Sequence, residues 1–72
     1  MSAPIALIEK NSRETLRVAW ETYEGHTFLD VRVYYRTEDG DLKPTRKGVA
    51  LSPAILGDVV RALVSAGGEA KA

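Results

Sequence analysis

Hydrophobic and polar positions alternate along two neighbouring stretches of the chain, with the period of a β-strand that buries one face. The alternation runs through 16–20 (LRVAW) and returns through 29–33 (LDVRV). The Glu-Gly pair at 24–25 lies midway and suits a two-residue turn with the glycine at positive φ. Closing a hairpin there sets Trp20 opposite Leu29 and continues the apolar pairing along both strands. The turn and the apolar pattern therefore predict the same register.

A second hairpin is predicted after the first, because the Asp-Gly pair within 38–41 (EDGD) is typical of a tight turn. Matching apolar positions across this turn predicts a third strand over 43–51, after a loop of about five residues. Pro44 cannot donate to a strand ladder, so it requires an edge strand or a bulge. A short strand at 5–8 completes a predicted antiparallel sheet of four strands.

The period changes to that of a helix after Leu51. Ser52 is a typical N-cap, proline occupies the first helical position, and the glycines at 67–68 are predicted to end the helix. One wide apolar face results, comprising Ile55, Leu56, Val59, Val60, Leu63 and Val64. This face is wider than one sheet requires, and Gly57 would permit close approach of another backbone.

Chain length makes a dimer through this helix the expected assembly. A chain of 72 residues is one domain at most and only marginally stable alone. It contains no cysteine, so disulfides and thiolate metal sites are excluded and oligomerisation remains as the supplement to the core. The predicted dimer interface comprises Ile55, Leu56, Val59, Val60 and Leu63.

Several chemistries lack the residues that they need. His26 is the single histidine, and no cysteine accompanies it in a metal site or a nucleophile relay. The acidic turn lacks the later ligands of an EF-hand loop, and the glycines around Lys47 do not form a phosphate-binding P-loop. We therefore expect no enzyme, metal or cofactor. No apolar run approaches the roughly 18 residues of a membrane span, and no secretory signal is apparent, so we expect a cytoplasmic protein.

Charge is balanced overall but unevenly distributed. Ten basic and ten acidic residues cancel, so nucleic-acid binding finds no support in net charge. Three cations nevertheless fall within 43–47 (KPTRK). The first hairpin also sets Arg17 directly opposite Arg32, where like charges repel unless they are neutralised. Two alternatives remain open: Asp30 neutralises the pair from within, or an external polyanion does so.

Aromatic side chains share the face of these arginines, namely Tyr23, His26, Phe28 and Tyr34. Rings among cations on an uncovered sheet are typical of single-stranded nucleic-acid binding, because bases stack on the rings while the phosphates follow the cations. Packing is the alternative role for each ring.

The run FLDVRVYYRTEDGDLKPTRKGVALSP, followed by one helix, resembles the C-terminal domain of the positive cofactor 4 transcriptional coactivators and their short bacterial relatives. The similarity spans 11–66. Its pattern is an Asp-x-Arg strand, two aromatics, an acidic Gly turn, Lys-Pro-x-Arg-Lys-Gly, a hydrophobic pair and a helix.

The resemblance implies an α+β fold: a curved four-stranded antiparallel sheet followed by one C-terminal helix, dimerising through the helix. It also implies binding of single-stranded or melted DNA without strong sequence preference. The DNA contacts that it implies are Arg32, Tyr35, Lys43, Arg46 and Lys47, with Tyr23 and His26 as weaker matches; our charge analysis adds Arg17. The expected organisation is an N-terminal segment with a short strand (1–10), a single-stranded DNA-binding domain (11–66) and a disordered tail (67–72).

Two adjacent tyrosines compete for the stacking role. Alternation puts Tyr34 on the Arg32 face and Tyr35 on the helix side, whereas the family uses the second aromatic, a tryptophan in the eukaryotic coactivator. Sheet curvature or a bulge near Thr37 could expose the strand end beyond the helix and bring Tyr35 beside Lys43 and Lys47. We therefore favour Tyr35.

The sequence as a whole predicts a non-catalytic, dimeric single-stranded DNA-binding protein, associated with the nucleoid and acting in transcription regulation or DNA repair. RNA in place of DNA stays open. The alternative is a protein-interaction module whose basic sheet docks an acidic partner from the transcription apparatus.

Overall fold

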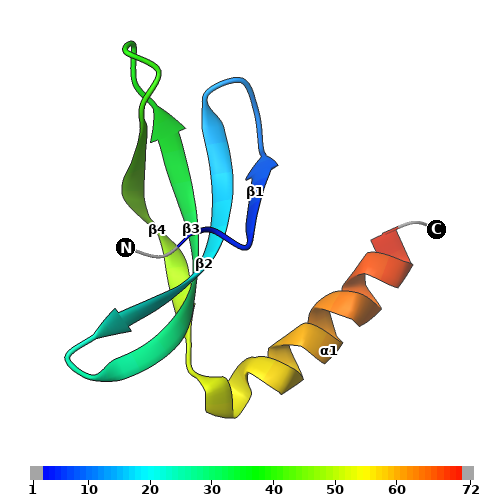
Figure 1. The fold of residues 1–72 in the computed structure, drawn as a ribbon. Helices are drawn as coiled ribbons and strands as arrows, with labels where there is room; N and C mark the ends of the chain where they lie inside the picture. Colours follow the sequence, from blue (N-terminus) through cyan, green and yellow to red (C-terminus); the bar gives the residue numbers. More distant parts are fainter. Residues whose placement is uncertain (1–2, 71–72) are drawn as a thin grey trace.

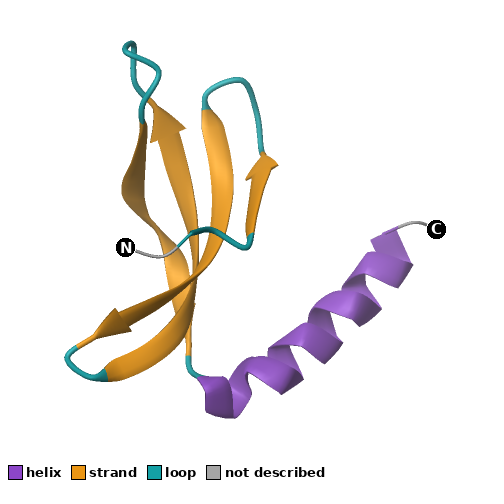
Figure 2. Cartoon of the chain, in the orientation of Figure 1, coloured by secondary structure: helices purple, strands orange, loops and turns teal. Residues whose placement is uncertain are grey.

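A computed structural model describes residues 3–70 as one four-stranded antiparallel sheet and one helix (Figures 1 and 2). The strands lie side by side in chain order, β1-β2-β3-β4. Their bounds are β1 Ala6–Glu9, β2 Glu14–Tyr23, β3 His26–Arg36 and β4 Leu42–Leu51, and the helix is α1 Pro53–Ala70. The predicted fold class is confirmed, and the short first strand starts one residue later than expected.

The hairpin of β2 and β3 has the predicted register. Trp20 pairs with Leu29 and Arg17 with Arg32. The turn between the strands has Glu24 at φ 52 and Gly25 at φ 80, both in the left-handed region. Two consecutive residues of this kind form the turn whose twist matches that of the flanking strands.

The next loop, residues 37–41, joins β3 to β4 and has the predicted length. Its first residue, Thr37, accepts a hydrogen bond from the Gly40 amide through its carbonyl and one from the Asp41 amide through its hydroxyl. Gly40 adopts φ 91, which favours glycine. The pairing of Val31 with Val49 is confirmed.

A bulge interrupts the pairing of β3 with β4. Arg32 pairs with Gly48, and the next pair joins Tyr34 to Pro44, so the register advances two residues on β3 and four on β4. The Thr45 hydroxyl stabilises the extra residues, because it donates to the Val33 carbonyl at 2.7 Å. Pro44 therefore lies on an edge strand beside a bulge, as expected. The predicted bulge position near Thr37 is wrong.

Gly48 is required at the inner end of the bulge. A Cβ atom at this position would lie 2.7 Å from the Val31 carbonyl oxygen and 2.9 Å from the Arg32 Cα. Both neighbours are backbone atoms of β3, which cannot move without disturbing the ladder. The close approach of the two strands thus depends on the missing side chain.

The helix begins as predicted and ends later. The Ser52 carbonyl accepts the Ile55 and Leu56 amides at 3.2 and 3.1 Å. The predicted end at Gly67 and Gly68 is wrong, because neither glycine adopts the positive φ of a C-terminal cap and the helix continues to Ala70. Of the predicted tail, residues 71–72 lie outside the described residues. No helix within residues 3–70 is long and apolar enough to cross a membrane.

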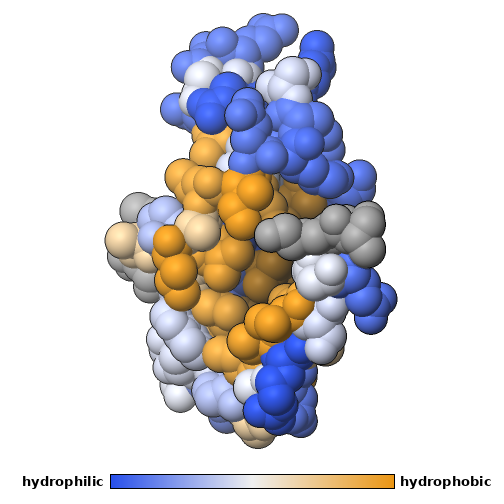
Figure 3. Space-filling view, turned by 90° about the vertical axis from the view of Figure 1, so that its right-hand side faces the viewer, coloured by the Kyte–Doolittle hydropathy of each residue, from blue (hydrophilic) through white to orange (hydrophobic). Residues whose placement is uncertain are grey.

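The core of the single chain is small. Within the described part, the buried apolar residues are Ala19, Val33 and Leu51, and no large side chain is fully buried. The helix leans away from the sheet, and its contacts with the strands fall mainly on β3 (Figure 1). Figure 3 shows the consequence from the side of the helix: apolar residues gather in an uncovered hollow in the middle of the molecule, with hydrophilic residues above and below.

We expect Gly48→Ala to destabilise the fold by about 1–3 kcal/mol, the usual effect of forcing an extra methyl group into a packed site. Gly67→Ala is the matched control, since a Cβ atom at that position would meet nothing within 4 Å and alanine favours a helix by about 1 kcal/mol over glycine. Urea unfolding followed by circular dichroism measures both. Equal stability of the Gly48 variant and the wild type would contradict the required close approach.

Candidate nucleic-acid interface

Arg17 and Arg32 lie opposite each other in the middle of the sheet, and each engages a carboxylate. Arg32 donates from Nε and Nη2 to Asp30 at 3.0–3.2 Å. Arg17 Nη1 lies 3.1 Å from Glu21 Oε2. The hydrogen bond with Asp30 raises the pKa of Arg32 above its ordinary value, against the opposing effect of desolvation. The charges of the two arginines are therefore neutralised within the chain, as the first of the two alternatives predicted for Asp30. Glu21 is a second acid that takes part.

Tyr34 belongs to the same arrangement. The Arg17 guanidinium lies over its ring, 5.3 Å from the centroid, and Arg17 Nη1 is 3.4 Å from its hydroxyl. Arg32 also donates to the Thr45 carbonyl at 3.0 Å. The ring of Tyr34 is thus occupied by a cation of the same chain. In the middle of this face, Arg17 and the Tyr34 ring already contact one another, so the ring is not available for stacking with a base.

Tyr35 occupies the opposite face and is open. Its exposed fraction is 42%. In the register it pairs with Glu14 on one side and with Lys43 on the other. Lys47 is exposed and lies close enough to Glu14 for its charge to help lower the pKa of that carboxyl. Tyr35 and Lys43 therefore pair at the end of the sheet, and Lys47 lies near the same end on β4.

Glu14 is the acid that pairs with Tyr35 in the register, and its charge is already engaged. Asn11 Nδ2 donates to it at 2.9 Å and Lys10 Nζ at 3.3 Å. These two hydrogen bonds, that from Asn11 first, lower the pKa of Glu14 below its ordinary value. The carboxylate accordingly holds the β1–β2 loop and does not stand free beside Tyr35.

The remaining predicted contacts fall elsewhere. Arg46 is exposed within the bulged part of β4. Tyr23 and His26 pair across the β2–β3 turn, both exposed. This turn lies at the other end of β3 from Tyr35, nine residues away, which is roughly 30 Å along an extended strand. The predicted site residues thus form two exposed groups at opposite ends of the sheet and one closed pair between them.

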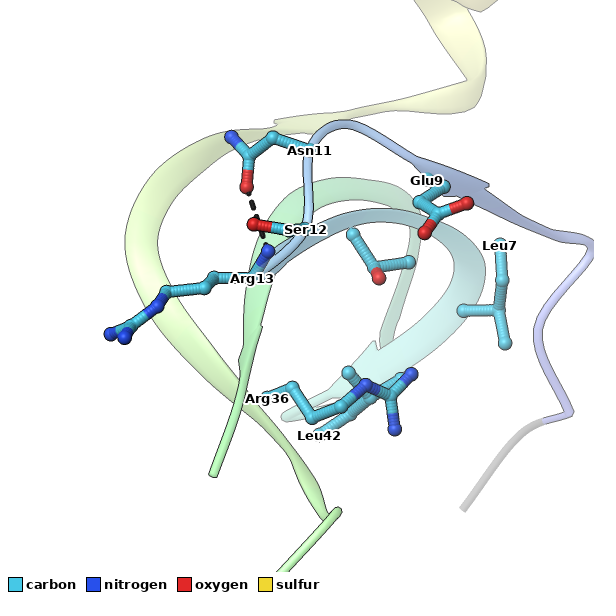
Figure 4. A pocket seen from close by; sticks show the side chains of 8 residues that line it. Leu7, Glu9, Asn11, Ser12, Arg13, Arg36 and Leu42 are labelled. Atoms are coloured by element: carbon cyan, nitrogen blue, oxygen red, sulfur yellow. Dashed lines mark hydrogen bonds between the residues drawn. The ribbon is translucent and has the colours of Figure 1, made fainter. Parts of the chain in front are cut away.

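Two arginines at the same end of the sheet as Tyr35, Arg13 and Arg36, were not predicted from the sequence. The Arg36 amide donates to the Arg13 carbonyl at 2.9 Å, which continues the β2–β3 ladder by one pair. Both residues are exposed and line the hollows under the β1–β2 loop, one of which is drawn in Figure 4. Extending the predicted register one step beyond the apolar pattern would have found them.

Comparison with known proteins gives concordant matches. A family model described as Transcriptional Coactivator p15 (PC4) matches residues 10–62. A crystal structure of a PC4 homologue from Burkholderia pseudomallei, in an orthorhombic form, is similar with a TM-score of 0.85 and 32% identity, covering 92% of this chain and 89% of that chain. Its tetragonal form gives a TM-score of 0.83 and 31% identity, covering 93% and 98%.

Proposed function

The chain belongs to the transcriptional coactivator p15 (PC4) family, as its sequence resemblance predicted, and from that premise we propose that it binds single-stranded DNA as a homodimer. The binding is non-catalytic and largely independent of sequence. It holds unpaired strands of a melted duplex in transcription regulation or DNA maintenance, on the nucleoid in the cytoplasm.

The observation that carries this proposal is the grouping of Tyr35, Lys43 and Lys47 at one end of the sheet. An exposed ring offers a stacking surface to any base, and neighbouring cations follow the phosphates. Tyr34 supports the assignment by contrast, because Arg17 already covers its ring. Arg46 and the pair of Tyr23 and His26 extend the proposed surface. Arg17 and Arg32 lie between the two exposed groups and stay proposed contacts, each already paired with a carboxylate.

Homodimerisation is supported by the uncovered apolar hollow. Exposed fractions on the helix are 48% for Ile55 and Val60, 64% for Leu63 and 70% for Val64. Trp20 and Val49 on the facing sheet are also exposed. A contiguous apolar surface of this kind marks a protein interface, and a second copy covers it with the same surface.

The alternative function, docking of an acidic protein partner from the transcription apparatus, would use the same cations without the ring. A titration against polydeoxythymidine over a range of salt concentrations separates the two. The proposed function predicts saturable binding that weakens steeply with salt. Absence of saturable binding at moderate salt would contradict it.

Tyr35→Ala should weaken binding by about 1–3 kcal/mol, the usual effect of losing one stacked base, with little change in salt dependence. Tyr35→Phe is the matched control and should bind as the wild type does, since the ring remains. Fluorescence anisotropy with a labelled oligodeoxythymidine measures both. If Tyr34→Ala carries the loss instead, the stacking ring has been assigned to the wrong face.

Lys47→Ala should weaken binding and also flatten the slope of log K against log salt by roughly 0.7, as expected for one phosphate contact on a single strand. The same anisotropy titration, repeated at several salt concentrations, gives the slope. A loss of affinity with an unchanged slope would show that Lys47 acts on the fold and not on a phosphate.

Val60→Glu should abolish the dimer and DNA binding with it, because a buried charge without a partner opposes association and the single chain has little core. Ser65→Glu is the matched control, since the helical period puts Ser65 on the opposite side of α1. Sedimentation equilibrium measures the mass of each. A Val60 variant that remains a dimer would contradict an interface through this face.

A further inference from the structure

Arg13 and Arg36 form a second like-charged pair across β2 and β3, and this pair lacks internal neutralisation. Among the described residues, neither guanidinium lies within salt-bridge distance of a carboxylate. Like charges opposite each other on neighbouring strands are destabilising. The Arg17 and Arg32 pair is neutralised by Glu21 and Asp30, whereas the pair at the end of the sheet has no carboxylate partner among the described residues.

The surrounding chain holds the backbone of Arg13 and the side chain of Arg36 in place. Asn11 Oδ1 accepts the Arg13 amide at 3.0 Å and the Glu14 amide at 2.9 Å, which folds the β1–β2 loop over the end of β2. Arg36 Nη1 donates to the Gly40 carbonyl at 2.8 Å, which leaves its other N–H groups available. In Figure 4 the two side chains extend in opposite directions from their paired backbones, which fits two separate contacts better than one shared ion.

Two hollows border these arginines, and one of them also borders the proposed DNA surface. One, of about 360 Å³, is lined by Tyr35 together with Arg13, Arg36 and Ser12. The other, of about 300 Å³, opens on the opposite face, where Leu7 and Leu42 lie beside the same two arginines (Figure 4). Glu9 lines the second hollow, and Glu38 lines a third hollow beside the same two arginines, but no ion pair joins either acid to them. The stacking ring and the unpaired cations therefore border one space.

We propose that Arg13 and Arg36 each bind a phosphate of the nucleic-acid strand, on either side of the nucleotide whose base stacks on Tyr35. The inference rests on the proposed function and extends its contact surface from β3 and β4 to the β1–β2 loop. Ser12 precedes Arg13 on this loop, lines the same hollow and adds a hydroxyl donor.

A nucleic-acid strand fits this end better than an acidic peptide does. The hollow that holds both arginines also contains an exposed aromatic ring, and bases supply the flat partner that such a ring takes. Guanidinium groups match phosphate oxygens with paired N–H donors. An acidic peptide would engage the arginines without engaging Tyr35.

The test compares Arg13→Gln, Arg36→Gln and the double variant with the wild type, by anisotropy with a labelled oligodeoxythymidine at several salt concentrations. Each single variant should flatten the slope of log K against log salt by about 0.7, and the double variant by about 1.4. Arg61→Gln is the matched control, because Arg61 is exposed on the helix and paired with Asp58; it should leave the slope unchanged. Arg13→Lys should retain the slope, since the charge remains.

Thermal unfolding separates binding from folding. Because neither guanidinium is paired with a carboxylate, removing one of the two charges should leave the unfolding midpoint unchanged or raise it. Arg36→Gln removes the hydrogen bond to the Gly40 carbonyl and can therefore lower stability. Arg13→Gln still tests DNA binding in that case, because the Arg13 side chain makes no hydrogen bond within the described residues.

The outcomes are distinct. A wild type that does not bind the oligonucleotide would contradict the proposed function itself. A wild type that binds, with a double variant of unchanged slope, would overturn the inference while leaving that function standing. If the double variant keeps its DNA slope but loses binding to polyglutamate, the two arginines serve an acidic partner and the inference is wrong.

Discussion

The constraint on which the rest of the structure depends is that one helix does not cover one sheet. The chain places apolar residues on one face of four strands and on a wide stripe of the helix, yet α1 leans away from the sheet and leaves both surfaces open (Figures 1 and 3). With only three small or medium apolar side chains buried, the described part of the chain has little core of its own. A second copy would supply the missing layer. The same open arrangement keeps the far end of the sheet clear of the helix, where Tyr35 lies.

Among the described residues, the cations in the middle of the sheet are paired with carboxylates, whereas several cations at its end are not. In the middle, each arginine of the facing pair is matched by an acid on its own strand, and Tyr34 is packed beneath Arg17. At the end, Glu14, which pairs with Tyr35, is engaged by the β1–β2 loop, and several cations have no carboxylate partner in the described residues. A chain of zero net charge can in this way present a locally cationic surface.

Much of the fold could be predicted from local chemistry, and the failures have identifiable physical causes. The turn at 24–25 and the apolar alternation independently specify one register, so the first hairpin was predictable. The bulge position was not, because it depends on Thr45 bonding to the Val33 carbonyl and on Gly48 meeting β3 closely, which are contacts between strands. The helix end was missed because Gly67 and Gly68 remain helical in place of forming a left-handed cap. For the site, alternation identified the two faces but could not reveal which arginines already have partners.

The most direct test of the central claim is the thermal unfolding midpoint of the wild-type protein as a function of its own concentration. If a second copy completes the core, folding and association are coupled and the midpoint rises steadily with concentration, while sedimentation shows a dimer throughout the folded range. A midpoint independent of concentration, together with a folded monomer at micromolar concentration, would contradict the account.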